Sequence, residues 1–569
     1  MIKPAITTVK NTTRHPSNGL NDSSGWTRLE RLVPAGLISA MDMDMDISLF
    51  CRVSTMAALS TTKVLPFDSV MNIETMTNIF PEVDPINVPR TIQLRSEQDC
   101  SEAFHLLLAI LHNAELGYYI RHIDILRDTS FHGHFKPTPV QRFISEEDRM
   151  LLRQAIRNCG WYDMDEEMVL NMLLQKNFDP DFSNGLQPVR GGRHTRGSHI
   201  IQALAVLLIS VSPNLESIKL RPIGRYMKEG FSHLPLEQFL VGASNAIHDK
   251  NNPLKNLLKN LRRIDLLHTD DVLARDPILF NPYDLFYHMS LFDQLPSIEQ
   301  ICVGGMEIDE DGQEDLPPLS SNIQRIDLLH SVLPTMFLCS VIASSKRLQH
   351  FSHSVGGRAT IDEGNWHMGF PAILRALLVH RESLECLDLD TDCDYSSTLD
   401  DEEFEEYLSS KPDDNDYPDS DINIDERDET QDDDDRRAFA NQRSVVKLIF
   451  HQSGTLRNFT ALRQLNIGVK CLFGMALGIS AQHSVNTKLA DLLPPHLERL
   501  CIRGYIPGNN QFYDTHIQDL FQKFVAGQLP GLTEVIGVQE FIPNSETVHM
   551  DDIDKHPELV WIDERDAII

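Results

Sequence analysis

The hexapeptide Arg-Ile-Asp-Leu-Leu-His occurs twice in this chain, at Arg263–His268 and at Arg325–His330. Both copies overlap a phrase of the form apolar-x-x-apolar-x-apolar that recurs ten times, usually after a run of residues able to form a helix. Six of the nine steps between successive phrases are 25 to 37 residues long, which is typical of stacked strand-plus-helix units. The phrases begin at Ile120, Leu215, Leu261, Ile298, Ile323, Leu348, Leu384, Leu462, Leu497 and Leu532.

The residues around the phrase favour the same interpretation. The positions between its apolar residues are repeatedly charged or polar, as in Leu497-Glu-Arg-Leu500. The apolar run at 200–211 precedes one phrase and is closed by Pro213-Asn214, a turn signal. The final apolar-x-apolar step fits a short strand with alternating faces, and the run before it fits a helix. We therefore predict an α/β solenoid of parallel strands, each joined to the next through a helix.

Regular structure is expected to begin near residue 90. Arg90–Leu94 reads as a strand, Ser96 as the N-cap of an amphipathic helix, and Ile120–Ile125 as the returning strand. Such a strand-helix-strand crossover is almost always right-handed. Further helices are expected at Ser145–Gly160 and Met164–Lys176.

The charge of the chain is concentrated in one segment. The 569 residues carry a formal net charge of -32. Residues 390–435 hold 22 acidic residues against Lys411 and Arg427, a net charge of -20, so the rest of the chain carries -12. The segment lacks apolar periodicity, and we predict a disordered acidic insertion in the solenoid. It is either a passive solvated loop or a segment that folds back on basic side chains. Its charge disfavours nucleic acid as a partner.

The sequence offers little catalytic or metal chemistry. Its nine cysteines include no Cys-x-x-Cys pair, so we expect reduced thiols and no zinc site. Asp390-x-Asp392-x-Asp394 opens like a calcium loop, but Tyr395 occupies its glycine position. The sequence therefore predicts no enzyme and no cofactor. The amino terminus has no signal-peptide pattern and no apolar run is long enough for a bilayer, so a cytoplasmic or nuclear protein without membrane contact is expected.

Two stretches near the start of the repeats resemble a known family. Pro89–Asp99, followed by the helix and by Glu115–Ile125, is similar to the first repeat unit of filamentous-fungal F-box and leucine-rich-repeat-like proteins. The later Leu-Glu-x-Leu-x-Leu phrases resemble the body of that family. The resemblance implies a leucine-rich-repeat-like solenoid, a right-handed horseshoe of parallel strands and outer helices that binds protein partners.

An F-box precedes the repeats in that family, and residues 29–63 resemble a degenerate one. An extra residue separates Leu32 from Pro34, the Met-Asp tract at 41–46 replaces the middle helix, and the usual aromatic and basic finish is missing. The resemblance implies docking to a Skp-type adaptor of a cullin-RING ubiquitin ligase; a decayed box and a chance similarity are the alternatives. The positions implied to bind the adaptor are Leu32, Pro34, Leu37, Ile38, Leu49, Phe50 and Val53.

These observations divide the chain into segments. We predict a disordered leader at 1–28, the F-box-like segment at 29–63, a linker at 64–89 and the solenoid at 90–569, interrupted by the insertion at 390–435.

The strands also predict a recognition surface. Each strand should bury its last two apolar residues and turn the flanking residues to the opposite face, where stacking aligns them. This face should be a mixed polar strip with an excess of arginine that binds protein, unless it is merely solvated. Its predicted residues are Lys219, Arg221, Arg263, Asp265, Arg325, Asp327, His350, Asp388, Gln464, Arg499 and Arg503.

Two functions fit these predictions. The first is a substrate-recognition subunit of a Skp-cullin-F-box type ubiquitin ligase, a monomer outside that complex. The second is a non-catalytic leucine-rich-repeat interaction scaffold with no link to ubiquitin. The segment at 29–63 separates them.

Overall fold

The computed structural model divides the chain into two units, Met1–Asn72 and Ile73–Ile569. All the residues that it describes belong to the second unit. They are 88–126, 135, 137–138, 140–176, 195–221, 223, 234–246, 254, 257–266, 281–293, 295–308, 316–355, 369–390, 440–441, 443–478 and 487–544.

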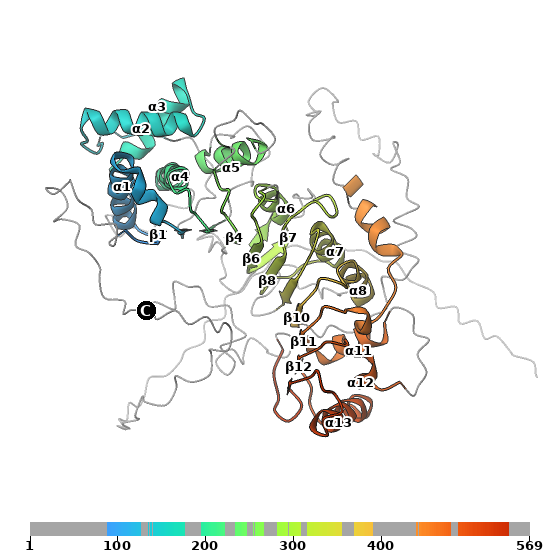
Figure 1. Ribbon diagram of the computed structural model, residues 1–569. Coiled ribbons are helices and arrows are strands. Elements are labelled where there is room, and N and C mark those ends of the chain that lie inside the picture. Colours follow the sequence, from blue (N-terminus) through green and yellow to red (C-terminus); the bar gives the residue numbers. More distant parts are fainter. Residues whose placement is uncertain are drawn as a thin grey trace, which may run out of the picture. The chain divides into compact units, whose positions relative to one another are not determined.

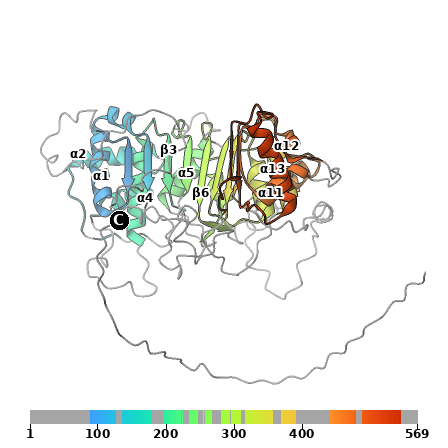
Figure 2. The ribbon, with the colours of Figure 1, turned by 90° about the horizontal axis from the view of Figure 1, so that it is seen from below.

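One parallel sheet of eleven strands organises the described residues (Figures 1 and 2). Its strands follow one another in sequence order, and each hydrogen-bonds to the next. The strands are β1 (Thr91–Leu94), β2 (His122–Ile125), β3 (Ser217–Leu220), β4 (Arg263–Leu266), β6 (Gln300–Gly304), β8 (Arg325–Leu329), β9 (His350–Ser354), β10 (Cys386–Asp390), β11 (Gln464–Gly468), β12 (Arg499–Arg503) and β13 (Glu534–Ile536).

The repeated phrase accounts for this sheet. All ten copies supply a strand, and β1 is the strand expected at 90–94. The fourth position of each phrase pairs with the fourth position of the next, as Ile264 does with Ile301 and Ile301 with Ile326. The same row continues through Leu387 to Leu500. The prediction of an α/β chain with stacked parallel strands is confirmed, and this arrangement is compatible with a solenoid.

Helices lie between most successive strands, as predicted, but between β6 and β8 the described residues hold β7 and no helix. The predicted cap at Ser96 is present as a capping box, in which Ser96 accepts a hydrogen bond from the Asp99 backbone N–H. Gly160 follows the second helix with φ 92, the left-handed cap expected from the sequence. The labelled α-helices are α1 (Glu97–His112), α2 (Glu146–Asn158), α3 (Asp163–Leu174), α4 (Thr195–Ser210), α5 (Pro235–Ala246), α6 (Leu285–Ser290), α7 (Thr335–Ser344), α8 (Phe370–Leu378), α11 (Val469–Leu477), α12 (Leu489–Leu492) and α13 (Gln511–Val525), and residues 443–450 are helical as well.

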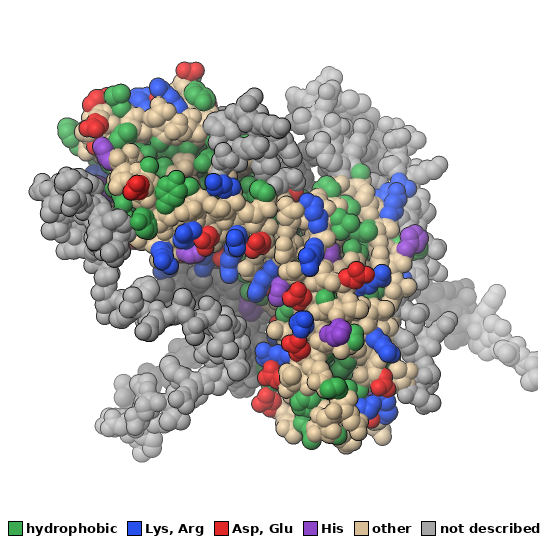
Figure 3. All heavy atoms as spheres, in the orientation of Figure 1, with side chains coloured by type: hydrophobic (Ala, Val, Ile, Leu, Met, Phe, Trp, Pro, Cys, Tyr) green, Lys and Arg blue, Asp and Glu red, His purple; other side chains and the backbone are tan. Residues whose placement is uncertain are grey.

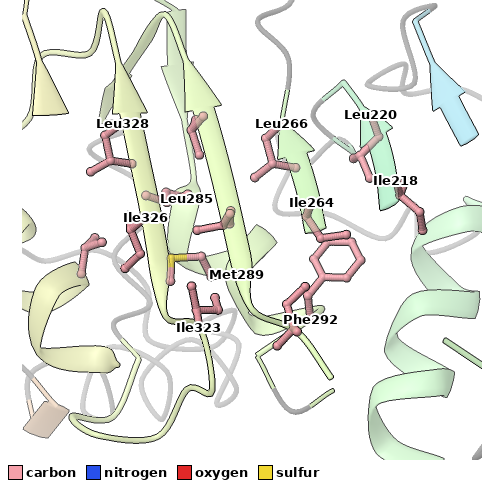
Figure 4. Packing of buried hydrophobic residues seen from close by; sticks show 14 of the residues in the cluster. Ile218, Leu220, Ile264, Leu266, Leu285, Met289, Phe292, Ile323, Ile326 and Leu328 are labelled. Carbon is pink, nitrogen blue, oxygen red and sulfur yellow. The ribbon is translucent and has the colours of Figure 1, made fainter. Parts of the chain in front are cut away.

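The core lies between the sheet and these helices. Along β2, β3 and β4 the apolar residues are buried and alternate with polar ones, so one face of the sheet packs on the helices. Figure 4 shows Ile264 and Leu266 of β4 and Ile326 and Leu328 of β8 on either side of β6, with Met289 of α6 packed beneath the strands. Burying one such side chain contributes about 1.5–3 kcal/mol before the loss of chain entropy is counted. Each added repeat therefore extends one continuous core.

A short second sheet was not predicted. Strands β5 (Asn281–Tyr283) and β7 (Met306–Ile308) pair in parallel. Each has only three residues, and β5 contains Pro282, so neither shows the alternation by which strands are recognised in a sequence.

Several predicted segments lie outside the described residues. They are the leader at 1–28, the F-box-like segment at 29–63, nearly all of the linker and the insertion after its first residue. We predicted that this first residue, Asp390, belongs to a disordered loop. It is instead the last residue of β10 and is only 6% exposed. Asp390 belongs to the strand because it still pairs with Ser354 of the neighbouring strand β9.

One histidine occupies a core position of the ladder. His353 of β9 pairs with Leu328 and Leu389 and is completely buried. Its Nε2 lies 3.1 Å from the Ser331 carbonyl oxygen, so this nitrogen carries the hydrogen, whereas Nδ1 has no hydrogen-bond partner among the described residues. Burial lowers the pKa of His353 from 6.5 to about 4, an effect that the bond to Ser331 only partly offsets. The imidazole is therefore neutral in the folded chain.

This histidine should make stability depend on pH. The unfolded chain takes up a proton on His353 below about pH 6.5 and the folded chain only near pH 4, so stability falls as the pH drops through that window. Through His353 the free energy of unfolding of the unaltered chain should fall by about 2 kcal/mol between pH 7 and pH 5. We expect this fall to be absent in His353→Leu. Urea unfolding at the two pH values measures it. The exposed His496→Leu is the control, and an unchanged pH dependence in His353→Leu contradicts the assignment.

Candidate functional site

The face of the sheet opposite the core carries two rows of mostly polar side chains, which we call the polar face. The pairing of the strands sets both rows. The first row is Thr91, His122, Ser217, Arg263, Gln300, Arg325, His350, Cys386, Gln464, Arg499 and Glu534. The second row is Gln93, Asp124, Lys219, Asp265, Cys302, Asp327, Ser352, Asp388, Asn466, Cys501 and Ile536.

The aspartates of the second row occupy every other strand of the sheet. Asp124, Asp265, Asp327 and Asp388 stand on β2, β4, β8 and β10, each separated from the next by one strand with a different residue. Adjacent strands lie about 4.8 Å apart, so neighbouring carboxylates would repel strongly, whereas alternate ones are about 9.6 Å apart. The sheet thereby holds a row of like charges without direct contact between them.

The two identical hexapeptides form the same ion pair. Arg263 donates from Nε to both carboxylate oxygens of Asp265, at 2.8 and 2.9 Å. Arg325 donates from Nε to Asp327 Oδ2 at 2.7 Å. Gln300, on the strand between them, also donates to Asp327, at 3.1 Å. The arginines are thus held in place by carboxylates of their own strands.

A second cluster of polar side chains connects the three strands β10, β11 and β12. Arg503 of β12 donates from Nη1 to Asp388 Oδ1 at 2.7 Å and from Nη2 to Oδ2 at 3.4 Å. Its Nη1 also lies 3.6 Å from Asp390, and Asn466 of β11 donates to Asp388 at 3.0 Å. Burial lowers the pKa of Arg503, but Asp388 and then Asp390 outweigh it and raise that pKa.

The predicted excess of arginine on this face is wrong. Five cations (Lys219, Arg263, Arg325, Arg499 and Arg503) stand with six anions (Asp124, Asp265, Asp327, Asp388, Asp390 and Glu534) on the rows and strand ends. The prediction counted Asp265, Asp327 and Asp388 but not the others. Figure 3 likewise shows acidic and basic side chains interspersed on the visible surface. The face is close to neutral.

Arg221 also departs from the prediction, because it follows the end of β3 and is only 6% exposed. The other predicted residues of the strip stand on the face where the alternation of the strands puts them. Asp327, however, is also only 6% exposed, since its own arginine and Gln300 cover it.

The sequence prediction overlooked several residues of the polar face. His122 bonds through Nδ1 to Ser217 Oγ at 2.8 Å, and Gln93 donates to Asp124 at 3.3 Å. Gln300 was overlooked as well. All of them occupy the third or fifth position of the phrase, or the matching position of β1, so the periodicity that found the strands also contains this signal.

Two of the three cysteines on the polar face, Cys302 and Cys386, are poor nucleophiles. Burial, and then Asp265 and Asp327, raise the pKa of the Cys302 thiol to about 12. Burial, and then Asp388, raise that of Cys386 to about 11. Both thiols stay protonated near neutral pH and are therefore unreactive.

Comparison with known proteins gave no match to any family model and none to a curated protein. Among the residues that the structure describes, His, Cys, Asp and Glu side chains form no group of three or more able to hold a metal ion. No helix in the described part of the chain combines the length and the apolar character that crossing a bilayer requires.

The Arg503 cluster should stabilise the fold. Arg503→Met leaves Asp388 and Asp390 close together without their common cation, and we expect a loss of about 2 kcal/mol in the free energy of unfolding. Urea unfolding measures it, with exposed Arg457→Met as the control. In the double variant with Asp388→Asn the two losses should not add, because one interaction is removed twice. Additive losses would show that the contact contributes nothing.

Proposed function

We propose that this protein is a non-catalytic, leucine-rich-repeat-like protein that binds other proteins through its polar face. The observation that carries the proposal is the alignment of two polar rows along eleven parallel strands. Repeat proteins built in this way present a long surface that no single loop could provide. A right-handed horseshoe with outer helices, as in the family that the sequence resembles, is part of the proposal.

The size of the polar face supports a macromolecular partner. Ten strand-to-strand steps of about 4.8 Å give a length of about 48 Å, and two rows with their side chains are about 15 Å wide. The product, about 700 Å², is near the roughly 800 Å² that each partner contributes to a standard protein interface. The mixed charge favours protein over nucleic acid, which is bound by an excess of cations.

Within this class we propose a substrate-recognition subunit of a Skp-cullin-F-box type ubiquitin ligase, acting in the cytoplasm or nucleus. Its support is the similarity of residues 29–63 to a degenerate F-box, followed by the repeats. The alternative is an interaction scaffold with no link to ubiquitin, which the departures from the F-box pattern favour.

Site-specific crosslinking tests binding through the polar face. A photo-crosslinking amino acid at Gln464, exposed in the first row, should give a discrete covalent adduct with a protein of the native extract. The same group at Gln154, exposed on α2 and away from the polar face, is the control. Equal adducts at the two positions, or none at Gln464, would remove the support for this face.

Co-purification tests the ligase subunit. A Skp-type adaptor should purify with the full chain and be lost when Leu49→Asp or Phe50→Asp introduces a charge into the predicted apolar contact, because burying an unpaired carboxylate is costly. Thr61→Asp adds the same charge within 29–63 but outside the implied contact positions, and should retain the adaptor. If no adaptor purifies with the unaltered chain, the ligase subunit is contradicted and the interaction scaffold is the remaining proposal.

A further inference from the structure

Arg263 and Arg325 pair with aspartates of their own strands, whereas Arg499 and Arg503 pair with carboxylates of other strands. Each of the first two uses only its Nε atom, on the aspartate two residues further along its own strand. No described residue accepts a hydrogen bond from the Nη atoms of either guanidinium. The side chains are 48% and 49% exposed. Each guanidinium is therefore fixed along one edge and offers the other edge to a ligand.

The free edge suits one kind of group. Two parallel N–H donors of a guanidinium match the two oxygens of a carboxylate. Because Asp265 and Asp327 already restrain the arginine side chains, less rotational freedom is lost when a ligand binds. The same ion pairs leave the site without net charge, since each arginine is neutralised by its aspartate. A ligand must then be recognised by contact and not by long-range attraction.

The sheet fixes the distance between the two arginines. Arg263 pairs with Gln300, and Gln300 with Arg325, so two strand spacings separate them, or about 9.6 Å. A polyproline II segment has three residues per turn and a rise of about 3.1 Å, so its residues i and i+3 lie on one side, about 9.3 Å apart. Acidic residues at those positions match the pair.

We propose that Arg263 and Arg325 form a two-point site for an extended acidic segment of a partner protein, whose carboxylates stand at positions i and i+3. The site rests on the proposed function of the polar face and specifies the partner that this face selects. A nucleic acid fits less well, because its affinity depends on many phosphate contacts with an excess of cations, which this nearly neutral face lacks.

His350, the next residue of the first row, adds no charge to the site near pH 7. Burial, and then Arg325, lower the pKa of His350, so its imidazole is neutral near pH 7. The cations that contact the ligand are thus the two guanidinium groups, with the Gln300 side chain between them.

Proline-rich peptides of fixed length test the spacing. Fluorescein-labelled peptides would carry Glu-Pro-Pro-Glu, Glu-Pro-Glu or Gln-Pro-Pro-Gln between the same flanking prolines, and anisotropy would measure their binding to the full chain at low salt. We expect Glu-Pro-Pro-Glu to bind about tenfold more tightly than the other two, the ratio that about 1.4 kcal/mol gives. Arg263→Gln or Arg325→Gln should abolish this preference, and Arg325→Lys should weaken it, because lysine lacks the planar fork.

Arg457→Gln is the matched control, since Arg457 is exposed on η7 (Leu456–Asn458) and away from the polar face. It should leave the preference unchanged. Equal binding of the three peptides, no saturable binding of Glu-Pro-Pro-Glu, or an equal effect of Arg457→Gln would each overturn the proposal. If an adduct still forms at Gln464, only the two-point site has failed; if no adduct forms there either, the binding function of the face has failed too.

Discussion

The register of the parallel strands is the constraint on which the rest of the structure depends. Because each strand pairs with its neighbour at the same position of the repeated phrase, one sequence position becomes one continuous row. A shift of a single residue would exchange the faces of a strand, moving Ile326 out of the core and Arg325 or Asp327 into it. Burial of the apolar rows thus also determines which polar side chains meet on the other face.

Most of the sheet could be predicted from the sequence because the apolar positions that set this register recur in every copy of the phrase. The strands follow the phrase even where the spacing between phrases is 78 residues, as between Leu384 and Leu462, since their apolar positions are still filled. The pair β5 and β7 could not be predicted, because three-residue strands show no alternation. The boundary at Asp390 was missed because composition marks a charged segment, not the last hydrogen bond of a strand.

The polar face could be predicted only in part, for a physical reason. Phrase position identifies its members, but their interactions depend on the order of the strands in space. The spacing of Asp124, Asp265, Asp327 and Asp388 on every other strand appears only once that order is known. Counting residues in the sequence therefore predicted a mixed polar strip with an excess of arginine, whereas the further carboxylates between and beside the arginines leave the face nearly neutral.

Neutrality does not make the arginines of this face equivalent. Arg503 is 21% exposed and directs both Nη atoms to Asp388, so its hydrogen-bonding capacity is used to join three strands. Arg263 and Arg325 each pair with one aspartate through Nε alone and remain half exposed. Which edge of the guanidinium the aspartate occupies therefore decides whether an arginine serves the fold or is available to a partner, a distinction that net charge cannot reveal.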